Sequence, residues 1–150
     1  MDEIDRKIID ILQKDGRMAQ AAIAEAVGLS VSAVNERVRR LTEAGTFAIK
    51  AVPNPEAVGF GVTAFLLVLL GKPSDDAPFC AAMAEVPEVQ EVHHVTGEWS
   101  YLLKVRARSV GDLESLMQQR IKTAPGITRS FTMIALSSPK ETSALPMLLP

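Results

Sequence analysis

Apolar residues recur at helical spacing in the first third of the chain and at strand spacing in much of the remainder. Between Asp2 and Lys14 they stand at positions i, i+4, i+7 and i+8, which predicts an amphipathic helix. The residues of this stripe are Ile4, Ile8, Ile11 and Leu12. Acidic side chains in the first turn suit the positive N-terminal end of a helix, and Asp15-Gly16 ends it.

The stretch from Met18 to Lys50 predicts two helices joined by a tight turn at Gly28-Leu29-Ser30, followed by a strand. Ser30 can cap the second helix by accepting a backbone N–H, whereas Ala19 offers no such cap to the first. The second helix has an apolar face at helical spacing, formed by Val34, Val38 and Leu41. Residues 47–52 then read as a strand, as in a winged helix-turn-helix.

On a wheel of 100° per residue, the second of these helices presents a polar face opposite its apolar one. That face carries Ser32, Asn35, Glu36, Arg39 and Arg40. Short polar side chains near the start of a helix, with arginines behind them, suit a helix whose tip enters the major groove of DNA. The first fifty residues hold eight Lys/Arg and eight Asp/Glu, so they give no basic footprint. The alternative is two packed helices with a solvated charged face.

The rest of the chain predicts four strands and two helices after a boundary at Pro53-Asn54-Pro55. The expected elements span 62–70, 75–86, 89–96, 101–107, 110–123 and 127–136. The first strand is apolar on both faces, and the strand from Tyr101 alternates apolar and polar residues. The order β-α-β-β-α-β is that of the ferredoxin-like split unit, with both helices on one face of the sheet. The other face needs a cover, and a second copy of the chain is the simplest one.

The composition is that of a soluble globular protein, because 47% of the residues are hydrophobic, 23% are charged and the net charge is −2. Cys80 is the one cysteine, so no internal disulfide is expected and the cytoplasm is the natural compartment. Asp2, Glu3 and Asp5 stand where a secretion signal would be positively charged. The longest apolar run, Val62–Leu70, is too short to cross a bilayer, so no membrane partner is expected.

No motif in the sequence predicts catalysis or the binding of a metal or cofactor, so an enzyme is not expected. His93 and His94 are adjacent, so on a strand they face opposite ways and cannot chelate one metal together. Asp75-Asp76 reads as a helix start, and Cys80 reads as a packing residue. We therefore predict neither a catalytic site nor a metal or cofactor site.

Several motifs, in this order along the chain, resemble those of the Lrp/AsnC family, the feast/famine transcriptional regulators. They are Ile4-Asp5-Arg6-Lys7-Ile8-Ile9, Leu12-Gln13-Lys14-Asp15-Gly16-Arg17, Val27-Gly28-Leu29-Ser30, Arg37-Val38-Arg39-Arg40-Leu41 with Gly45, Gly97 with Tyr101-Leu102-Leu103, and Pro125-Gly126-Ile127. Each motif is weak alone, but the ordered set covers nearly the whole chain. The resemblance implies a bacterial or archaeal regulator that dimerises through its C-terminal sheet, forms larger assemblies such as octamers, and senses an amino acid.

The resemblance implies that residues 31–44 form the recognition helix of a DNA-binding domain. The residues expected at the DNA are Ser30, Ser32, Ala33, Asn35, Arg37, Arg39 and Arg40. The arginines are expected at phosphates or bases, and for Arg37 the alternative is an ion pair within the chain. A two-fold dimer of such helices would read a pseudo-palindromic operator in double-stranded DNA, with half-sites about 10 bp or a multiple apart.

The resemblance also implies an effector site at the loop between the second and third strands of the C-terminal domain, near a subunit interface. Its expected residues are Gly97, Glu98, Trp99, Ser100 and Tyr101, with Met133, Ile134 and Ala135 as response positions. A glycine turn exposes backbone N–H groups that can hold a carboxylate, and Trp99 or Tyr101 can wall an apolar side chain. The family commonly has an aspartate where Ser100 stands, so a ligand other than an amino acid, or none, is the alternative. A plain hairpin turn is the alternative for the loop as a whole.

The expected fold class is α+β, an N-terminal winged helix-turn-helix followed by a C-terminal ferredoxin-like βαββαβ domain. The expected parts are a DNA-binding domain (1–45), a hinge strand and linker (46–60), a ligand-binding and oligomerisation domain (61–136) and a C-terminal tail (137–150). Apolar residues in the tail, Leu145, Met147, Leu148 and Leu149, are expected to pack on a partner or on their own domain. The expected function is a cytoplasmic, sequence-specific transcriptional regulator that responds to a small molecule. The alternatives are an architectural DNA-binding protein of the same family without an effector, and an enzyme or metabolic sensor built on the ferredoxin-like domain.

Overall fold

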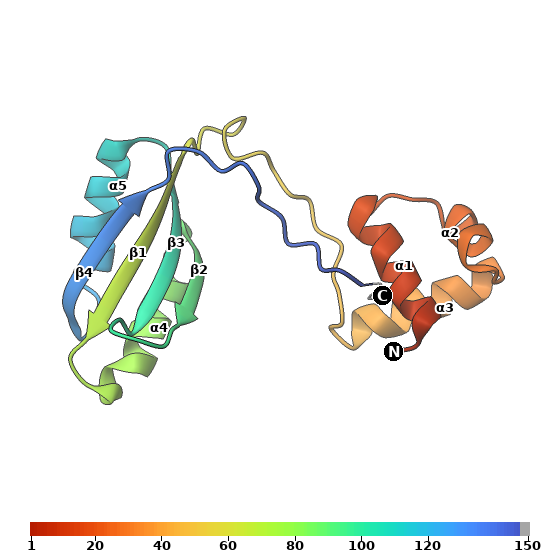
Figure 1. Ribbon diagram of the computed structural model, residues 1–150, viewed down its shortest axis with the longest axis horizontal. Helices are drawn as coiled ribbons and strands as arrows, with labels where there is room; N and C mark the ends of the chain where they lie inside the picture. The colour runs from red at the N-terminus through yellow and green to blue at the C-terminus, as the bar shows by residue number, and fades with distance from the viewer. Residues whose placement is uncertain (148–150) are drawn as a thin grey trace. The chain divides into compact units, whose positions relative to one another are not determined.

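The computed structural model describes residues 1–147, which fall into two compact units (Figure 1). The first unit consists of Met1–Val52 together with residues 140–147, and the second consists of Pro53–Pro139. The tail joins the first unit through Gln13, whose side-chain amide oxygen accepts the Leu145 N–H at 2.7 Å. Leu148 and Leu149 lie outside the described residues.

Three helices form the first unit, as their apolar spacing predicts: α1 (Glu3–Lys14), α2 (Gln20–Val27) and α3 (Val31–Glu43). Apolar side chains of all three helices meet in one core. Figure 1 shows the three helices packed together. The buried residues of this small core are Ile8, Leu12, Ile23, Ala24 and Val34. Burial of an isoleucine, leucine or valine side chain stabilises a fold by about 1.5–3 kcal/mol, and this is the main force holding the three helices together.

The helix ends carry the signals that the sequence predicts. Ser30 precedes α3, and its hydroxyl accepts the Ala33 N–H at 3.2 Å, which confirms the expected cap. Ala19 precedes α2 and makes no such side-chain bond. Gly28 ends α2 in the left-handed conformation, with φ of 70°, which only glycine adopts without strain. This glycine reverses the chain between α2 and α3.

The strand predicted for residues 47–52 does not form, and this expectation was wrong. A strand needs a neighbour to receive its backbone hydrogen bonds, and none of the described strands pairs with this segment. Phe47 instead packs its side chain against the three-helix core. Ile49 and Val52 remain 57% and 86% exposed, so Phe47 is the residue that anchors this irregular segment to the core.

The second unit contains a four-stranded antiparallel sheet with strand order β2-β3-β1-β4 (Figure 1). Its strands are β1 (Val62–Leu70), β2 (Val89–His94), β3 (Tyr101–Ala107) and β4 (Ile127–Ile134). A 3-10 turn (Pro73–Asp75) and α4 (Asp76–Ala84) follow β1, while α5 (Val110–Leu116) and a π-helical turn (Met117–Ile121) follow β3. The element order β-α-β-β-α-β and the antiparallel pairing confirm the ferredoxin-like prediction.

The two faces of this sheet differ in how well they are covered. One face packs under α4 and α5, and the residues that β1 contributes to it are Ala64, Leu66, Val68 and Leu70. The opposite face carries the half-buried Phe65, Leu67 and Leu69 of β1. Beside them on β4, Phe131 is 53% exposed and Met133 is 41% exposed. One face of the sheet is therefore buried under helices, and the other is an apolar face that no helix of the described chain covers.

Several elements end earlier than their patterns predict. The strands β2 and β4 stop at His94 and Ile134, two residues short in each case, and α4 stops at Ala84.

A turn at Pro125-Gly126 leads into β4, and Gly126 has φ of 80°. A Cβ at this position would collide with the side chain of Asp75, so glycine is required here for close approach as well as for conformation.

Candidate functional site

A buried carboxylate lies in the helical unit where the start of α1 meets α3. The Asp5 side chain is only 2% exposed and accepts hydrogen bonds from two arginines of α3. Arg37 Nη1 lies 2.7 Å from Asp5 Oδ1, and Arg40 Nη2 lies 3.0 Å from both carboxylate oxygens. Burying a charge is costly unless it is paired and hydrogen-bonded, and Asp5 meets both conditions.

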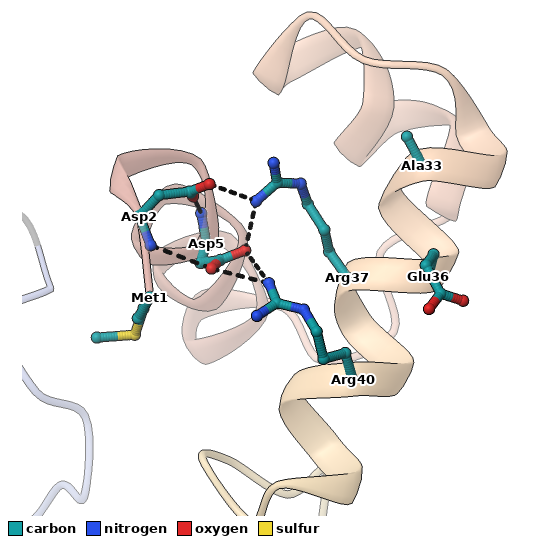
Figure 2. A pocket seen from close by; sticks show the side chains of 7 residues that line it. All are labelled: Met1, Asp2, Asp5, Ala33, Glu36, Arg37 and Arg40. Carbon is teal, nitrogen blue, oxygen red and sulfur yellow. Dashed lines mark hydrogen bonds and ion pairs between the residues drawn. The ribbon is translucent and has the colours of Figure 1, made fainter.

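Asp2 completes this network from the first turn of α1 (Figure 2). Its carboxylate accepts the Asp5 N–H at 2.8 Å and Arg37 Nη1 at 2.7 Å, while the Asp2 N–H donates to Asp5 at 3.1 Å. The two aspartates thus form a reciprocal capping box at the start of α1. Figure 2 shows Arg37 and Arg40 reaching from α3 to these aspartates. The same residues line an open hollow of about 500 Å³.

The network also changes the ionisation of Asp5. Burial raises the pKa of this carboxyl, but the hydrogen bonds from Arg37, the Asp2 backbone and Arg40 outweigh burial and lower the pKa from 3.8 to about 2. Asp5 therefore stays charged at any physiological pH. Arg37 forms the ion pair that was the alternative to a DNA contact, and its side chain is 27% exposed.

The third predicted arginine, Arg39, lies on the exposed side of α3 between two glutamates of the same helix. Arg39 Nη2 is 2.7 Å from Glu36 Oε1, and Arg39 Nη1 is 2.8 Å from Glu43 Oε1. Hydrogen bonding to Glu36 and Glu43 raises the pKa of Arg39, and bonding to Arg39 lowers the pKa of Glu36. All three arginines expected at DNA therefore have acidic partners within the chain.

The polar tip of α3 is open to solvent, as the helical wheel predicts. Ser32 and Asn35 are exposed, and Ala33 between them is half-buried. The Ser30 and Ser32 hydroxyls lie 3.1 Å apart, so the capping serine is also a neighbour of the exposed tip. The Asn35 side chain offers both a hydrogen-bond donor and an acceptor.

The predicted effector loop joins β2 to β3 and is braced by β4. Glu98 forms an ion pair with Arg129, whose guanidinium also lies 4.3 Å from the centre of the Trp99 ring. Gly97 has φ of 105°, which favours glycine in the turn. Arg129 thus holds two residues of the loop at once. Nothing in the sequence marked Arg129 as a residue of this site.

The Ser100 and Tyr101 side chains contact the sheet and its neighbouring helix rather than the outer side of the loop. Ser100 Oγ accepts the Leu70 N–H at 3.1 Å, and the Ser100 N–H donates to Val68 at 2.9 Å. Tyr101 is buried, with its ring 5.0 Å from Phe79 and 4.9 Å from His94 between ring centres. Trp99 is therefore the aromatic residue of the loop that remains placed to contact a ligand.

The response positions of β4 lie at the other end of the sheet from this loop (Figure 1). Arg129 pairs with Leu69 beside the loop, whereas Met133 pairs with Phe65, four residues further along both strands. Four residues of strand span roughly 13 Å. Ile134 and Ala135 lie further still, so one chain alone does not bring Met133, Ile134 and Ala135 to the loop.

Other kinds of site were sought among residues 1–147. No group of three or more His, Cys, Asp or Glu side chains in that range is arranged to hold a metal ion. Within the same range, every helix is too short or too polar to cross a membrane. His93 lies 2.9 Å from Glu91 and His94 stacks on Tyr101, so the two histidines have separate partners.

Sequence reasoning missed the acidic partners of the arginines, and the reasons differ. Glu36, Arg39 and Glu43 stand at i, i+3 and i+7, so their pairing was available from helical spacing. The contact between Asp5 and Arg37 joins residues 32 positions apart, and no local pattern reports it. A buried, paired aspartate is visible only once the helices are packed.

A three-helix unit with an exposed polar tip, joined to a ferredoxin-like unit, defines a helix-turn-helix regulator of the α+β class. The model of winged helix-turn-helix DNA-binding domains matches residues 1–46, and the model of the Lrp/AsnC ligand binding domain matches residues 63–145. The chain therefore belongs to the Lrp/AsnC family of DNA-binding transcriptional regulators, as its sequence motifs predict.

Individual relatives support the same assignment over nearly the full length. The chain is 38% identical to the HTH-type transcriptional regulator FL11 of Pyrococcus horikoshii, covering 98% of this chain and 97% of the relative. A feast or famine regulatory protein from M. tuberculosis, solved with L-methionine, is 40% identical with a TM-score of 0.86, covering 96% of this chain and 97% of that one. A transcriptional regulator from Neisseria meningitidis, solved with L-Met, has a TM-score of 0.91 at 28% identity, covering 98% and 97%. These relatives are transcriptional regulators, which are not enzymes.

The Asp5 network predicts a specific loss of stability on substitution and at low pH. Asp5→Asn should lower the free energy of unfolding at pH 7 by about 2–4 kcal/mol, because two arginines lose the charge that they share. The folded-state pKa lies below the unfolded value, so the contribution of Asp5 is full above about pH 4 and disappears as the pH falls towards 2. Urea unfolding of both proteins, followed by circular dichroism at several pH values, measures this difference.

Asp10→Asn is the matched control in the same helix. Asp10 pairs with Lys14 at 2.7 Å on the surface, and such pairs contribute about 0–1 kcal/mol. Equal losses for Asp5→Asn and Asp10→Asn, or a gap between Asp5→Asn and the parent that persists at pH 2, would show that the network does not stabilise the unit.

Proposed function

We propose that the chain reads double-stranded DNA with the N-terminal half of α3 and that a small molecule bound at the β2–β3 loop alters this reading. The proposal that α3 binds DNA rests on one observation: one side of α3 is fixed within the unit while its N-terminal tip is free to contact a partner. Its inner side is fixed to α1 through the buried Asp5, while its tip with Ser32 and Asn35 stays exposed. A helix held this way can enter a major groove without losing its own packing.

The tip residues have the chemistry that base recognition requires. An asparagine amide can donate to and accept from an adenine edge at the same time, and a serine hydroxyl can bond to several bases. Ser30, Ser32, Ala33 and Asn35 are the proposed reading residues. Arg40 is 52% exposed although Asp5 holds one of its nitrogens, which suits a phosphate contact next to the groove. Arg37 is proposed as a structural residue and Arg39 as a conditional contact.

The uncovered face of the sheet supports a homodimer formed by two copies of this unit. Exposed phenylalanine and methionine on β4 lie beside the apolar β1 residues, and a second copy of the same face is a self-complementary cover. A two-fold dimer presents two α3 helices and reads a pseudo-palindromic operator. We also propose that dimers associate further into octamers. The proposed location is the cytoplasm, and we propose no enzymatic role.

An amino acid is the effector class that we propose. Two similar proteins were solved with L-methionine, and both cover this chain almost completely. Gly97 gives the loop a left-handed turn, whose backbone N–H groups we propose as the carboxylate-binding part of the site. Arg129 covers one face of the Trp99 ring, so we propose the opposite face as the wall for an apolar side chain. Ser100 cannot offer the charge of an aspartate to an ammonium group, so we assign that role to Glu98, which is 70% exposed beside Arg129.

The distance between the β2–β3 loop and the response positions at the end of β4 supports an effector site shared between subunits. The loop and Met133 lie at opposite ends of β4, and the loop has few apolar walls of its own. A neighbouring subunit that brings its own Met133, Ile134 and Ala135 would supply the missing wall. Ligand binding would then change how subunits associate, which is a direct route from effector to DNA binding.

Two substitutions in α3 should separate base reading from phosphate binding. Asn35→Ala should change the preferred sequence with little change in salt dependence, because it removes a base contact. Arg40→Ala should weaken binding to all sequences and reduce the salt slope by about 1. Selection of duplexes from a random pool, followed by titrations at several salt concentrations, measures both effects.

Arg108→Ala is the control, since it removes the same charge from an exposed arginine of the second unit. If Asn35→Ala and Arg40→Ala had equal salt slopes and the same sequence preference, the proposed division of labour would be wrong.

A thermal-shift screen against the twenty amino acids should identify the effector. At about 100-fold its dissociation constant, a ligand stabilises the native state by about 2.7 kcal/mol, which gives a clear shift. Trp99→Ala should abolish the shift, while Phe60→Ala, in the linker, should keep it. A screen without any shift in the parent protein would favour the architectural alternative, a DNA-binding protein without an amino-acid effector.

A further inference from the structure

Arg39 lies in the middle of α3, on its exposed side, and two glutamates hold all three of its nitrogens. Glu36 receives Nη2 at 2.7 Å and Nε at 3.2 Å, and Glu43 receives Nη1 at 2.8 and 2.9 Å. The guanidinium therefore presents both of its hydrogen-bonding edges to carboxylates of its own helix. A phosphate that approached Arg39 would have to displace at least one of them.

The two glutamates bonded to Arg39, here called the glutamate clamp, contribute little to folding stability, but they reverse the sign of the local charge. The side chains of Arg39, Glu36 and Glu43 are 57%, 62% and 62% exposed, and exposed ion pairs contribute little to folding. Two glutamates against one arginine leave a net charge of −1 at this place on the helix. A DNA backbone meets repulsion here rather than attraction until the arginine is released.

The other arginines of α3 do not compensate for this charge. Arg37 and Arg40 are paired with Asp2 and Asp5, so three arginines face four carboxylates in all. Sequence-independent DNA binding comes mainly from basic side chains that release counterions from the phosphates. The surface around α3 lacks the surplus of positive charge on which that kind of binding depends.

We propose that Glu36 and Glu43 are specificity-determining residues, which mask Arg39 and so hold down the affinity of α3 for DNA of arbitrary sequence. The inference rests on the proposed function of α3 as the DNA-reading helix. Base contacts made by Ser32 and Asn35 on a correct site hold the helix close enough for a phosphate to replace a glutamate. On other sequences the clamp stays closed, and the glutamates repel the backbone.

Glu36→Gln and Glu43→Gln test this directly, singly and together, in the full chain. Glutamine keeps the size of each side chain and removes its charge. The double variant should bind a duplex of arbitrary sequence about eightfold more tightly at 0.1 M salt, with a salt slope steeper by about 0.9, because Arg39 then neutralises a phosphate. Affinity for a selected site should rise less, so the ratio of specific to non-specific affinity falls.

Further variants separate masking from other effects. Glu114→Gln makes the same change of net charge as either single variant, but on α5 in the other unit, and should leave non-specific affinity unchanged. Arg39→Ala should remove the gain when added to the double variant, yet change the non-specific affinity of the parent little. Glu43→Gln alone, at the end of α3 away from the reading tip, should increase non-specific affinity without altering the preferred sequence.

The possible failures are distinguishable. If the parent binds a selected duplex but the glutamine variants gain no non-specific affinity, the masking inference is refuted and the DNA-reading role of α3 stands. An equal gain for Glu114→Gln, or a gain that persists after Arg39→Ala, also refutes masking. If the parent selects no duplex from a random pool, the proposed function itself fails. Both glutamates are exposed, and circular dichroism verifies that each variant is folded.

Discussion

The helical unit depends on one buried carboxylate. Asp5 has almost no contact with solvent, and two arginines of α3 and the first turn of α1 supply its hydrogen bonds. The apolar core holds the three helices together but leaves some freedom to slide, since apolar contacts are not directional. The bonds to Asp5 are directional and charge-assisted, so they fix the position of α3 along α1. That position decides which residues of α3 face outwards.

The ion pairs of α3 reduce the attraction of its arginines to DNA phosphates. Each arginine expected at DNA has an acidic partner, which is consistent with the equal numbers of basic and acidic residues in the first fifty positions. Under the proposed function, such a surface places the weight of DNA binding on base contacts and on two α3 helices acting together. The uncovered apolar face of the sheet is where we propose that two copies of the chain associate, which would present the two α3 helices together.

The sequence predicts the local structure well, because helical and strand spacing reflect which face of each element is buried. The three helices, the alternation in β3 and the βαββαβ order follow from that spacing, and so does the exposed polar face of α3. Contacts between distant residues leave no local pattern. The pairing of Asp5 with Arg37 and the bracing of Trp99 by Arg129 were therefore missed. The predicted strand at 47–52 failed for the related reason that a strand requires a partner, which spacing alone does not report.

A crystal structure of the full chain on a duplex selected from random sequences tests this account most directly. The account predicts that the first turns of α3 lie in the major groove with Ser32 and Asn35 at base edges. It also predicts that Arg37 remains bonded to Asp5 as it is in the free chain. A complex in which DNA contacts another surface would contradict the account. So would a complex in which Arg37 leaves Asp5 for a phosphate, because the buried carboxylate would then not be what holds α3 in place.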